Sequence, residues 1–169
     1  GLQLFFNWHT TRQLQTYASI KRFTLMPDSK GRAVQGQVKG MPVALAVGGS
    51  FTGNAIQVGA SQTGIPSTYM SYLILEVSLG HAEWDGLALA RELDGSKGWT
   101  ASRPVDRGPR VRESLAALSR LPRYSILHLE VKRDKLLTMK LFAPDTAAEI
   151  NLLVDLVAEM GAALEATRP

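Results

Sequence analysis

The fold is decided by the C-terminal stretch from Pro144 to Leu164, PDTAAEINLLVDLVAEMGAAL. Thr146 and Glu149 have the spacing of a capping box, in which each side chain satisfies an otherwise unpaired backbone N–H group. The apolar residues that follow recur at the spacing of a helix with one buried face. They are Ile150, Leu153, Val154, Val157, Met160 and Leu164. This pattern predicts a long terminal helix that must pack its apolar face on another layer.

The other layer is predicted from alternating apolar residues, which are typical of strands with one buried side. The clearest case is YMSYLILEVSL at residues 69–79, where Leu73, Leu75 and Val77 share one side. Further strands are expected at residues 33–38, 41–47, 87–91, 127–131 and 137–141, with a short one near Ile56 and Val58. Glycine-rich or charged turns predict that 33–47 and 127–141 each form a hairpin. We expect the strand at 87–91 to pair with the one at 69–79, and a loop at residues 94–108.

Two more helices are expected. One spans residues 10–22, with Thr10 or Thr11 as its N-cap. The other begins at Pro109, a residue that suits the first helical turn, and ends before Pro122. The order helix, four or five strands, helix, hairpin, helix predicts an α+β fold. We expect the chain to form a single domain over residues 1–169. Its one mostly antiparallel sheet of about six to seven strands would be packed by an N-terminal, a middle and a long C-terminal helix.

The composition limits the kinds of chemistry open to the chain. Its 169 residues fit one domain, and 45% are apolar, which is ordinary for a globular protein. The chain has no cysteine, which excludes disulfides, iron–sulfur clusters and cysteine nucleophiles. No apolar run approaches the roughly 20 residues that cross a bilayer, and the first residues do not form a signal peptide. We expect a cytoplasmic bacterial protein, or a soluble domain of a longer protein truncated at its N-terminus.

The motifs that suggest chemistry are incomplete. Residues 31–36 and 48–53 have the glycine spacing of a phosphate-binding loop, but the required Lys-Ser or Lys-Thr does not follow. His81-Ala82-Glu83 matches half of a zinc deaminase motif whose other half needs two cysteines, so we interpret it as part of a turn. His128 is interpreted as structural. The sequence therefore predicts no catalytic residue, no metal site and no cofactor.

The formal net charge of +4 is concentrated in one part of the chain. Residues 103–140 hold ten Lys/Arg and four Asp/Glu, whereas residues 141–169 hold one and five. A convergent positive face would bind nucleic acid or an anionic membrane surface. The candidate basic surface consists of Arg103, Arg107, Arg110, Arg112, Arg120, Arg123, Lys132, Arg133 and Lys135.

The leading hypothesis is a non-enzymatic protein-binding or adaptor domain, whose partner is another protein or a second copy in a homodimer. Its order of elements resembles that of type III secretion chaperone-like domains, and this resemblance implies protein binding and frequent dimerisation. One alternative is a basic module that binds nucleic acid or an anionic membrane through residues 103–140. Another is a small-molecule-binding protein or enzyme, with a pocket between the sheet and the C-terminal helix bordered by Tyr69, Tyr72, Trp84 and Trp99.

Overall fold

The computed structural model describes residues 2–27, 29–47, 72–91, 99–102, 104, 109–118, 120, 127–141 and 146–167. Three helices and eight strands lie in this part of the chain. They are α1 (Leu2–Lys21), β1 (Thr24–Leu25), β2 (Ala33–Val38), β3 (Met41–Val47), β4 (Tyr72–Ser78), β5 (Ala88–Arg91), β6 (Trp99–Ala101), α3 (Pro109–Leu118), β7 (Leu127–Lys132), β8 (Lys135–Leu141) and α4 (Ala147–Ala166). The expected strand near Ile56 and Val58 and the stop at Pro122 lie outside the described residues.

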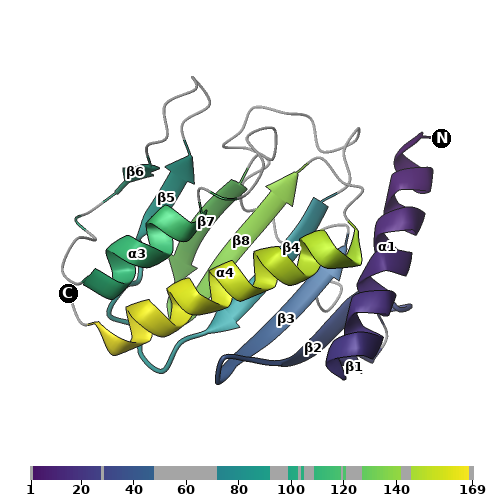
Figure 1. Ribbon diagram of the computed structural model, residues 1–169, viewed down its shortest axis with the longest axis horizontal. Helices are drawn as coiled ribbons and strands as arrows, with labels where there is room; N and C mark the ends of the chain where they lie inside the picture. The colour runs from purple at the N-terminus through teal and green to yellow at the C-terminus, as the bar shows by residue number, and fades with distance from the viewer. Residues whose placement is uncertain are drawn as a thin grey trace.

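All the strands join one sheet in the order β1-β2-β3-β4-β8-β7-β5-β6 (Figure 1). Every neighbouring pair in this order is antiparallel. Seven strands have three or more residues, and the edge strand β1 adds only two. The α+β class, the single antiparallel sheet and the N-terminal, middle and C-terminal helices are therefore confirmed.

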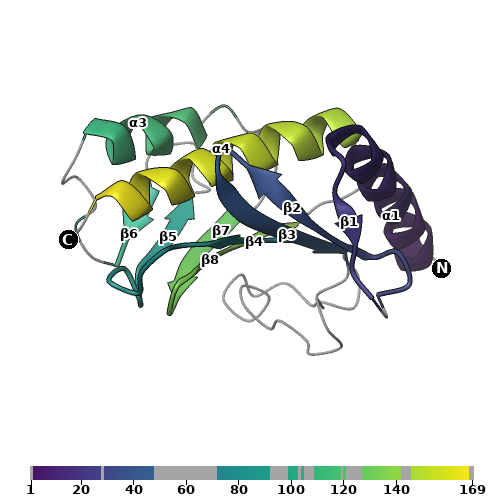
Figure 2. The same ribbon diagram turned by 90° about the horizontal axis from the view of Figure 1, so that it is seen from below.

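The three helices cover the same face of the sheet, and α4 lies across its centre (Figure 2). The predicted cap begins α4, because the Thr146 hydroxyl accepts a hydrogen bond from the Glu149 N–H at 3.1 Å. Later in the helix, Gly161 allows a close approach to β4. A Cβ atom added at Gly161 would lie 2.7 Å from Cγ1 of Val77, which is closer than carbon atoms pack.

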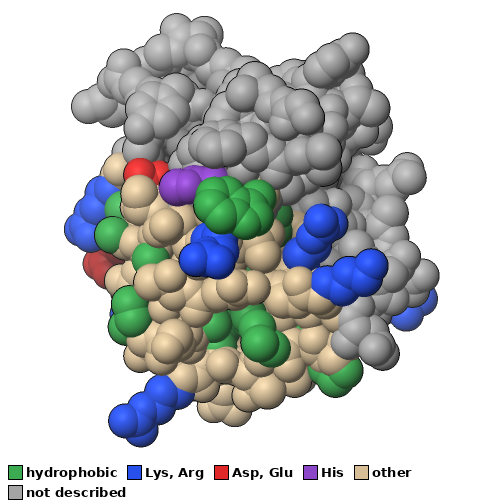
Figure 3. Space-filling view, turned by 90° about the vertical axis from the view of Figure 1, so that its right-hand side faces the viewer, with side chains coloured by type: hydrophobic (Ala, Val, Ile, Leu, Met, Phe, Trp, Pro, Cys, Tyr) green, Lys and Arg blue, Asp and Glu red, His purple; other side chains and the backbone are tan. Residues whose placement is uncertain are grey.

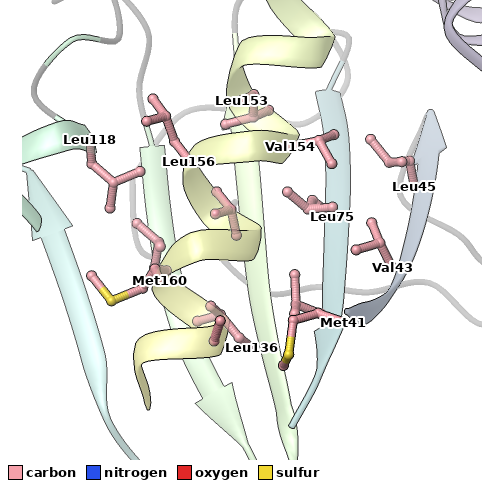
Figure 4. Packing of buried hydrophobic residues seen from close by; sticks show 14 of the residues in the cluster. Met41, Val43, Leu45, Leu75, Leu118, Leu136, Leu153, Val154, Leu156 and Met160 are labelled. Carbon is pink, nitrogen blue, oxygen red and sulfur yellow. The ribbon is translucent and has the colours of Figure 1, made fainter. Parts of the chain in front are cut away.

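The core fills the space between α4 and the covered face of the sheet (Figure 4). Ile150, Val154 and Val157 are fully buried, as the helical pattern predicts. They face fully buried strand residues that include Leu75 and Leu136. Each such side chain contributes roughly 1.5–3 kcal/mol relative to an exposed position. The sheet and α4 thus stabilise one another through their apolar faces.

The start of the first helix was predicted incorrectly. The helix α1 begins at Leu2, eight residues before the expected start at Thr10. Thr10 is fully buried inside the helix, so it does not serve as an N-cap. The helical pattern fails to mark this start because α1 has no acidic residue in its first turn and most of residues 2–8 are apolar, without a one-sided stripe.

The expected pairing of β5 with β4 is also wrong. The hairpin of β7 and β8 lies between them, so β5 pairs with β7 and β6 instead. Three strand spacings, about 14 Å, separate β4 from β5, and residues 79–87 cross that distance. This segment wraps the end of the hairpin: Leu79 donates its N–H to the Asp134 carbonyl, and Gly86 donates its N–H to the Val131 carbonyl.

The segment expected to be a loop, residues 94–108, contains a short strand. Trp99–Ala101 form the short strand β6, which closes the sheet at this edge. Glycine, serine and proline residues on both sides conceal a strand of only three residues, because such a strand shows no resolvable alternation.

Candidate functional site

The sheet has a second face, opposite α4, on which none of the described helices packs (Figure 2). We call it the helix-free face. Pairing register assigns residues to it, because a residue and its cross-strand partner project from the same side of a sheet. Gln35, Ala44 and Glu76 are aligned in this way across β2, β3 and β4. Leu137 on β8 continues the row.

The character of the helix-free face changes along the strands. Ala46, Ile74 and Met139 are buried at one end. At the other end, where β2 meets β3 and β7 meets β8, Gln37 and Pro42 are exposed. A partner molecule would therefore meet the polar end of this face.

A groove of about 420 Å³ lies at that polar end, and we call it the polar groove. The small side chain of Ala44 leaves the hollow, while longer polar side chains stand around it. The lining consists of Thr24, Gln35, Gly36, Gln37, Pro42, Val43, Ala44, Glu76, Ser78 and Lys135. The β2–β3 hairpin, β4 and β8, three segments that are distant in sequence, thus contribute to one site, together with Thr24 of β1.

The charged centre of the polar groove is Lys135. Its ammonium donates a hydrogen bond to Oγ of Ser78 at 2.6 Å and lies 3.8 Å from Oε1 of Glu76. The Lys135 side chain is 39% exposed and that of Glu76 is 27% exposed. Burial raises the pKa of the Glu76 carboxyl, Lys135 opposes this increase, and Asp134 adds to it. The carboxyl is therefore held in a site that only partly compensates its charge.

This arrangement suits binding better than nucleophilic catalysis. A serine nucleophile needs a base that accepts its proton. An ammonium that donates to the Ser78 oxygen has no free lone pair for that proton. The groove instead presents donors and acceptors, among them the carboxamides of Gln35 and Gln37.

The predicted basic residues fall in two places within the described part of the chain. Arg110 and Arg112 are exposed on α3, in the helical layer, and Arg110 is paired with Glu159 at 3.1 Å; Arg120 is exposed just after that helix. Lys132, Arg133 and Lys135 lie at the turn of β7 and β8, with Lys132 and Lys135 on the helix-free face. Arg103, Arg107 and Arg123 lie outside the described residues, so a single basic surface stays a prediction.

The histidines have structural surroundings. His128 is buried on β7, with Nε2 3.7 Å from Oε2 of Glu130. His81 lies within hydrogen-bonding distance of the Glu165 carbonyl at the end of α4, 3.1 Å from its Nε2. Beside it, the Trp84 indole donates to the Leu164 and Thr167 carbonyls at 2.9 and 2.7 Å. The turn around Trp84 thus satisfies carbonyl groups that a helix end leaves unpaired.

Neither a metal centre nor a membrane span is found in the residues that the structure describes. These residues contain no group of three or more His, Asp or Glu side chains able to hold a metal ion. None of the helices α1, α3 and α4 combines the length and apolar content that crossing a bilayer requires. The sheet side of α4 is filled by core side chains, and this packing favours binding at the surface over a pocket beneath that helix.

Sequence reasoning missed a second surface, at the α1 side of the domain. Trp8, Ile20 and Leu25 are 59%, 70% and 53% exposed. Side chains of Lys and Arg lie beside hydrophobic ones over this side (Figure 3). The signal was present in the charge of residues 1–47, which hold six Lys/Arg and one Asp. It disappears when the charge is counted over residues 1–102, because acidic residues after position 75 offset it.

Comparison with protein-family models, with curated proteins and with solved structures finds no significant match to this chain. The geometry of its own surfaces is therefore the basis for assigning a function.

Proposed function

We propose that this domain is a non-enzymatic protein-binding domain, which accepts another protein or a second copy of itself at the polar groove. The observation that carries the proposal is the groove itself, where the half-buried Glu76, Ser78 and Lys135 meet the exposed carboxamides of β2 on a face without a described helix. A polypeptide backbone offers alternating N–H donors and carbonyl acceptors. The exposed carboxamides of Gln35 and Gln37 can pair with both kinds of group.

The contacts of Lys135 support recognition of a specific partner. Because Lys135 is tied to Ser78 and lies near Glu76, its ammonium is positioned before any partner arrives. A positioned charge loses less conformational entropy on binding than a free one. A partner that brings an N–H donor to Glu76 would also offset the cost of its half-buried carboxyl, while a partner carbonyl oxygen could accept a hydrogen bond from Lys135. The positions of charged and hydrogen-bonding groups along the partner would then decide which partner binds.

The low walls of the groove favour a polypeptide over a small metabolite. Small-molecule sites are concave and enclose most of the ligand surface. Thr24, Gln35, Gln37 and Pro42 are all exposed where they border the groove, so it cannot enclose a ligand in that way. An extended segment laid across several strands would use the available surface more fully.

Site-specific photo-crosslinking tests the proposal. A photoreactive amino acid replaces Gln37 in the groove, and a control protein carries it at Arg112 on α3. In the native host, we expect a discrete crosslinked product from position 37 and none of that mass from position 112. Lys135→Glu should reduce the yield at least about tenfold, since reversing a partly buried charge costs more than about 1.4 kcal/mol.

The outcomes of this experiment separate the partners. A product of twice the chain mass assigns the groove to a second copy, and a product of another mass assigns it to a different protein. Equal products from positions 37 and 112, or a yield that Lys135→Glu leaves unchanged, would contradict binding at the groove.

A further inference from the structure

The exposed side of α1 combines two properties. It presents large apolar side chains, with Trp8 at 59% and Ile20 at 70% exposure. It is also rich in cations, because Arg12, Lys21 and Arg22 are exposed on or just after the same helix. Single exposed apolar residues need no explanation, but large apolar side chains beside several cations are the combination that interfacial membrane helices use.

These residues are contiguous along the helix. The Arg12 guanidinium lies 5.6 Å from the centre of the Trp8 ring, a cation–π contact. Arg12 and Ile20 line the same shallow hollow on the outer side of α1, together with Gln15, Thr16 and Ser19. Trp8, Arg12, Thr16, Ser19 and Ile20 form what we call the α1 surface. The exposed Lys21 follows at the end of the helix, beside Tyr17 and the start of α4. Figure 3 shows this side of the domain.

The neighbouring turn extends the positive charge of the α1 surface. Gln15 donates a side-chain hydrogen bond to the Gly31 carbonyl, which holds the turn between β1 and β2 against α1. This turn carries the exposed residues Lys30 and Arg32. Residues 8–47 hold six Lys/Arg and one acidic residue, Asp28, which lies outside the described residues, so this segment has a net charge of +5.

The inner side of α1 is already used for packing. Leu14, Tyr17 and Ala18 are buried against the core. Burial, together with the charge of Asp155 on α4, raises the pKa of the Tyr17 phenol, as expected for a side chain held inside the domain. The exposed Trp8 and Ile20 are therefore not part of this core, and α1 can present them to a partner surface while the domain stays folded.

We infer that the α1 surface docks the domain on an anionic lipid bilayer. Tryptophan prefers the boundary between headgroups and acyl chains, and Ile20, about 18 Å further along α1, would insert its apolar side chain when the helix lies flat on the bilayer. The cations Arg12, Lys21, Arg22, Lys30 and Arg32 would lie among acidic headgroups, where each increases partitioning about fivefold. Binding to nucleic acid would use these charges but would leave Ile20 without a role.

This docking does not depend on the proposed function of the polar groove. The groove lies on the helix-free face, whereas α1 lies in the helical layer (Figure 2). A bilayer in contact with the α1 surface would leave the polar groove on another side of the domain, so lipid and partner would not compete directly for one surface.

Vesicle co-sedimentation of the full chain tests the inference. The vesicles contain phosphatidylcholine alone or with about 30 mol% phosphatidylserine. We expect binding to the mixed vesicles, weak binding to phosphatidylcholine alone, and release as salt is raised. Arg12→Glu/Lys21→Glu should lower the partition coefficient on the order of a hundredfold. Ile20→Ser should lower it about tenfold without changing any charge.

Matched controls keep the result interpretable. Arg112→Glu/Arg120→Glu makes the same change in net charge away from the α1 surface, and we expect a loss below about fivefold. Circular dichroism checks that each variant stays folded. The inference is overturned if both double variants lose binding equally, or if phosphatidylcholine alone binds as well as the mixture. Tighter binding to a labelled RNA oligonucleotide, lost in Arg12→Glu/Lys21→Glu but not in Ile20→Ser, would assign the surface to nucleic acid instead.

Discussion

The two faces of the sheet differ although the same strands build both. On β4, Leu75 and Val77 face α4 and are fully buried, whereas Glu76 and Ser78 between and beyond them line the polar groove. The covered face is closed by apolar packing, and the groove end of the other face keeps polar groups partly in water. Successive side chains of a strand point to opposite faces, so one seven-residue strand carries both environments.

This difference separates stability from recognition. Substitutions on the covered face remove buried contacts or create cavities, so they change the free energy of unfolding. Substitutions in the groove remove partly hydrated contacts and change mainly what the face can bind. Pairs of substitutions that lie close together on opposite faces of the sheet test this difference.

The largest expected effect is on the covered side of β4. Leu75→Ala removes most of a fully buried side chain and should lower the free energy of unfolding by about 3 kcal/mol. Ser78→Ala, on the same strand, removes only the acceptor of a part-buried hydrogen bond and should cost less than about 1 kcal/mol. Urea denaturation of both variants measures the difference. Equal losses would contradict the assignment of the two faces.

Patterns within a few residues made this covered side predictable. The alternation at Leu73, Leu75 and Val77 identifies a strand and its buried side, and the spacing of Thr146 and Glu149 identifies the start of α4. Both signals arise from neighbours along the chain, where side-chain periodicity and backbone capping act directly.

Features that depend on distant segments were not predictable in the same way. The polar groove requires the registers of β2, β3, β4 and β8 to be known together. The separation of β4 from β5 depends on where a hairpin 40 residues later inserts, which no local pattern specifies. The α1 surface was missed for another reason: a charge count over 102 residues averages a basic segment with an acidic one.

A smaller effect is expected where α4 approaches the covered face most closely. Alanine is a better helix former than glycine by about 1 kcal/mol, so propensity alone predicts that Gly161→Ala stabilises the protein. The added Cβ would meet Cγ1 of Val77 at 2.7 Å, and the β-branched Val77 side chain is stiff. Overpacking should prevail and give a net loss of about 1–2 kcal/mol.

The double variant Gly161→Ala/Val77→Ala provides the test of this cause. If the contact with Val77 is responsible, the two substitutions together should cost less than the sum of their separate costs, by about 1 kcal/mol. A thermal or urea unfolding series on the four proteins gives the coupling. Stabilisation by Gly161→Ala alone would show that α4 lies farther from β4 than its packing on Val77 implies.

The smallest effect is expected on the helix-free face, and it depends on pH. Because burial raises the pKa of Glu76 above its ordinary value of 4.5, the folded chain binds this proton more tightly than the unfolded chain does. Between the ordinary and the raised pKa the native state holds more protons, so the contribution of Glu76 to stability falls as pH rises through that interval. Glu76→Gln should therefore gain less than about 1 kcal/mol at neutral pH and nothing at pH values below 4.5.

The difference in unfolding free energy between Glu76→Gln and the natural chain, measured from about pH 4 to pH 8, isolates this proton from all other titrating groups. Lys135→Met tests the contribution of Lys135, since it removes the ammonium that opposes the increase in the Glu76 pKa. The pH-dependent loss of stability should then extend to higher pH. A natural chain that becomes more stable than Glu76→Gln as pH rises would mean that the pairing with Lys135 outweighs burial, and the polar groove would then hold a compensated ion pair with little to gain from a partner.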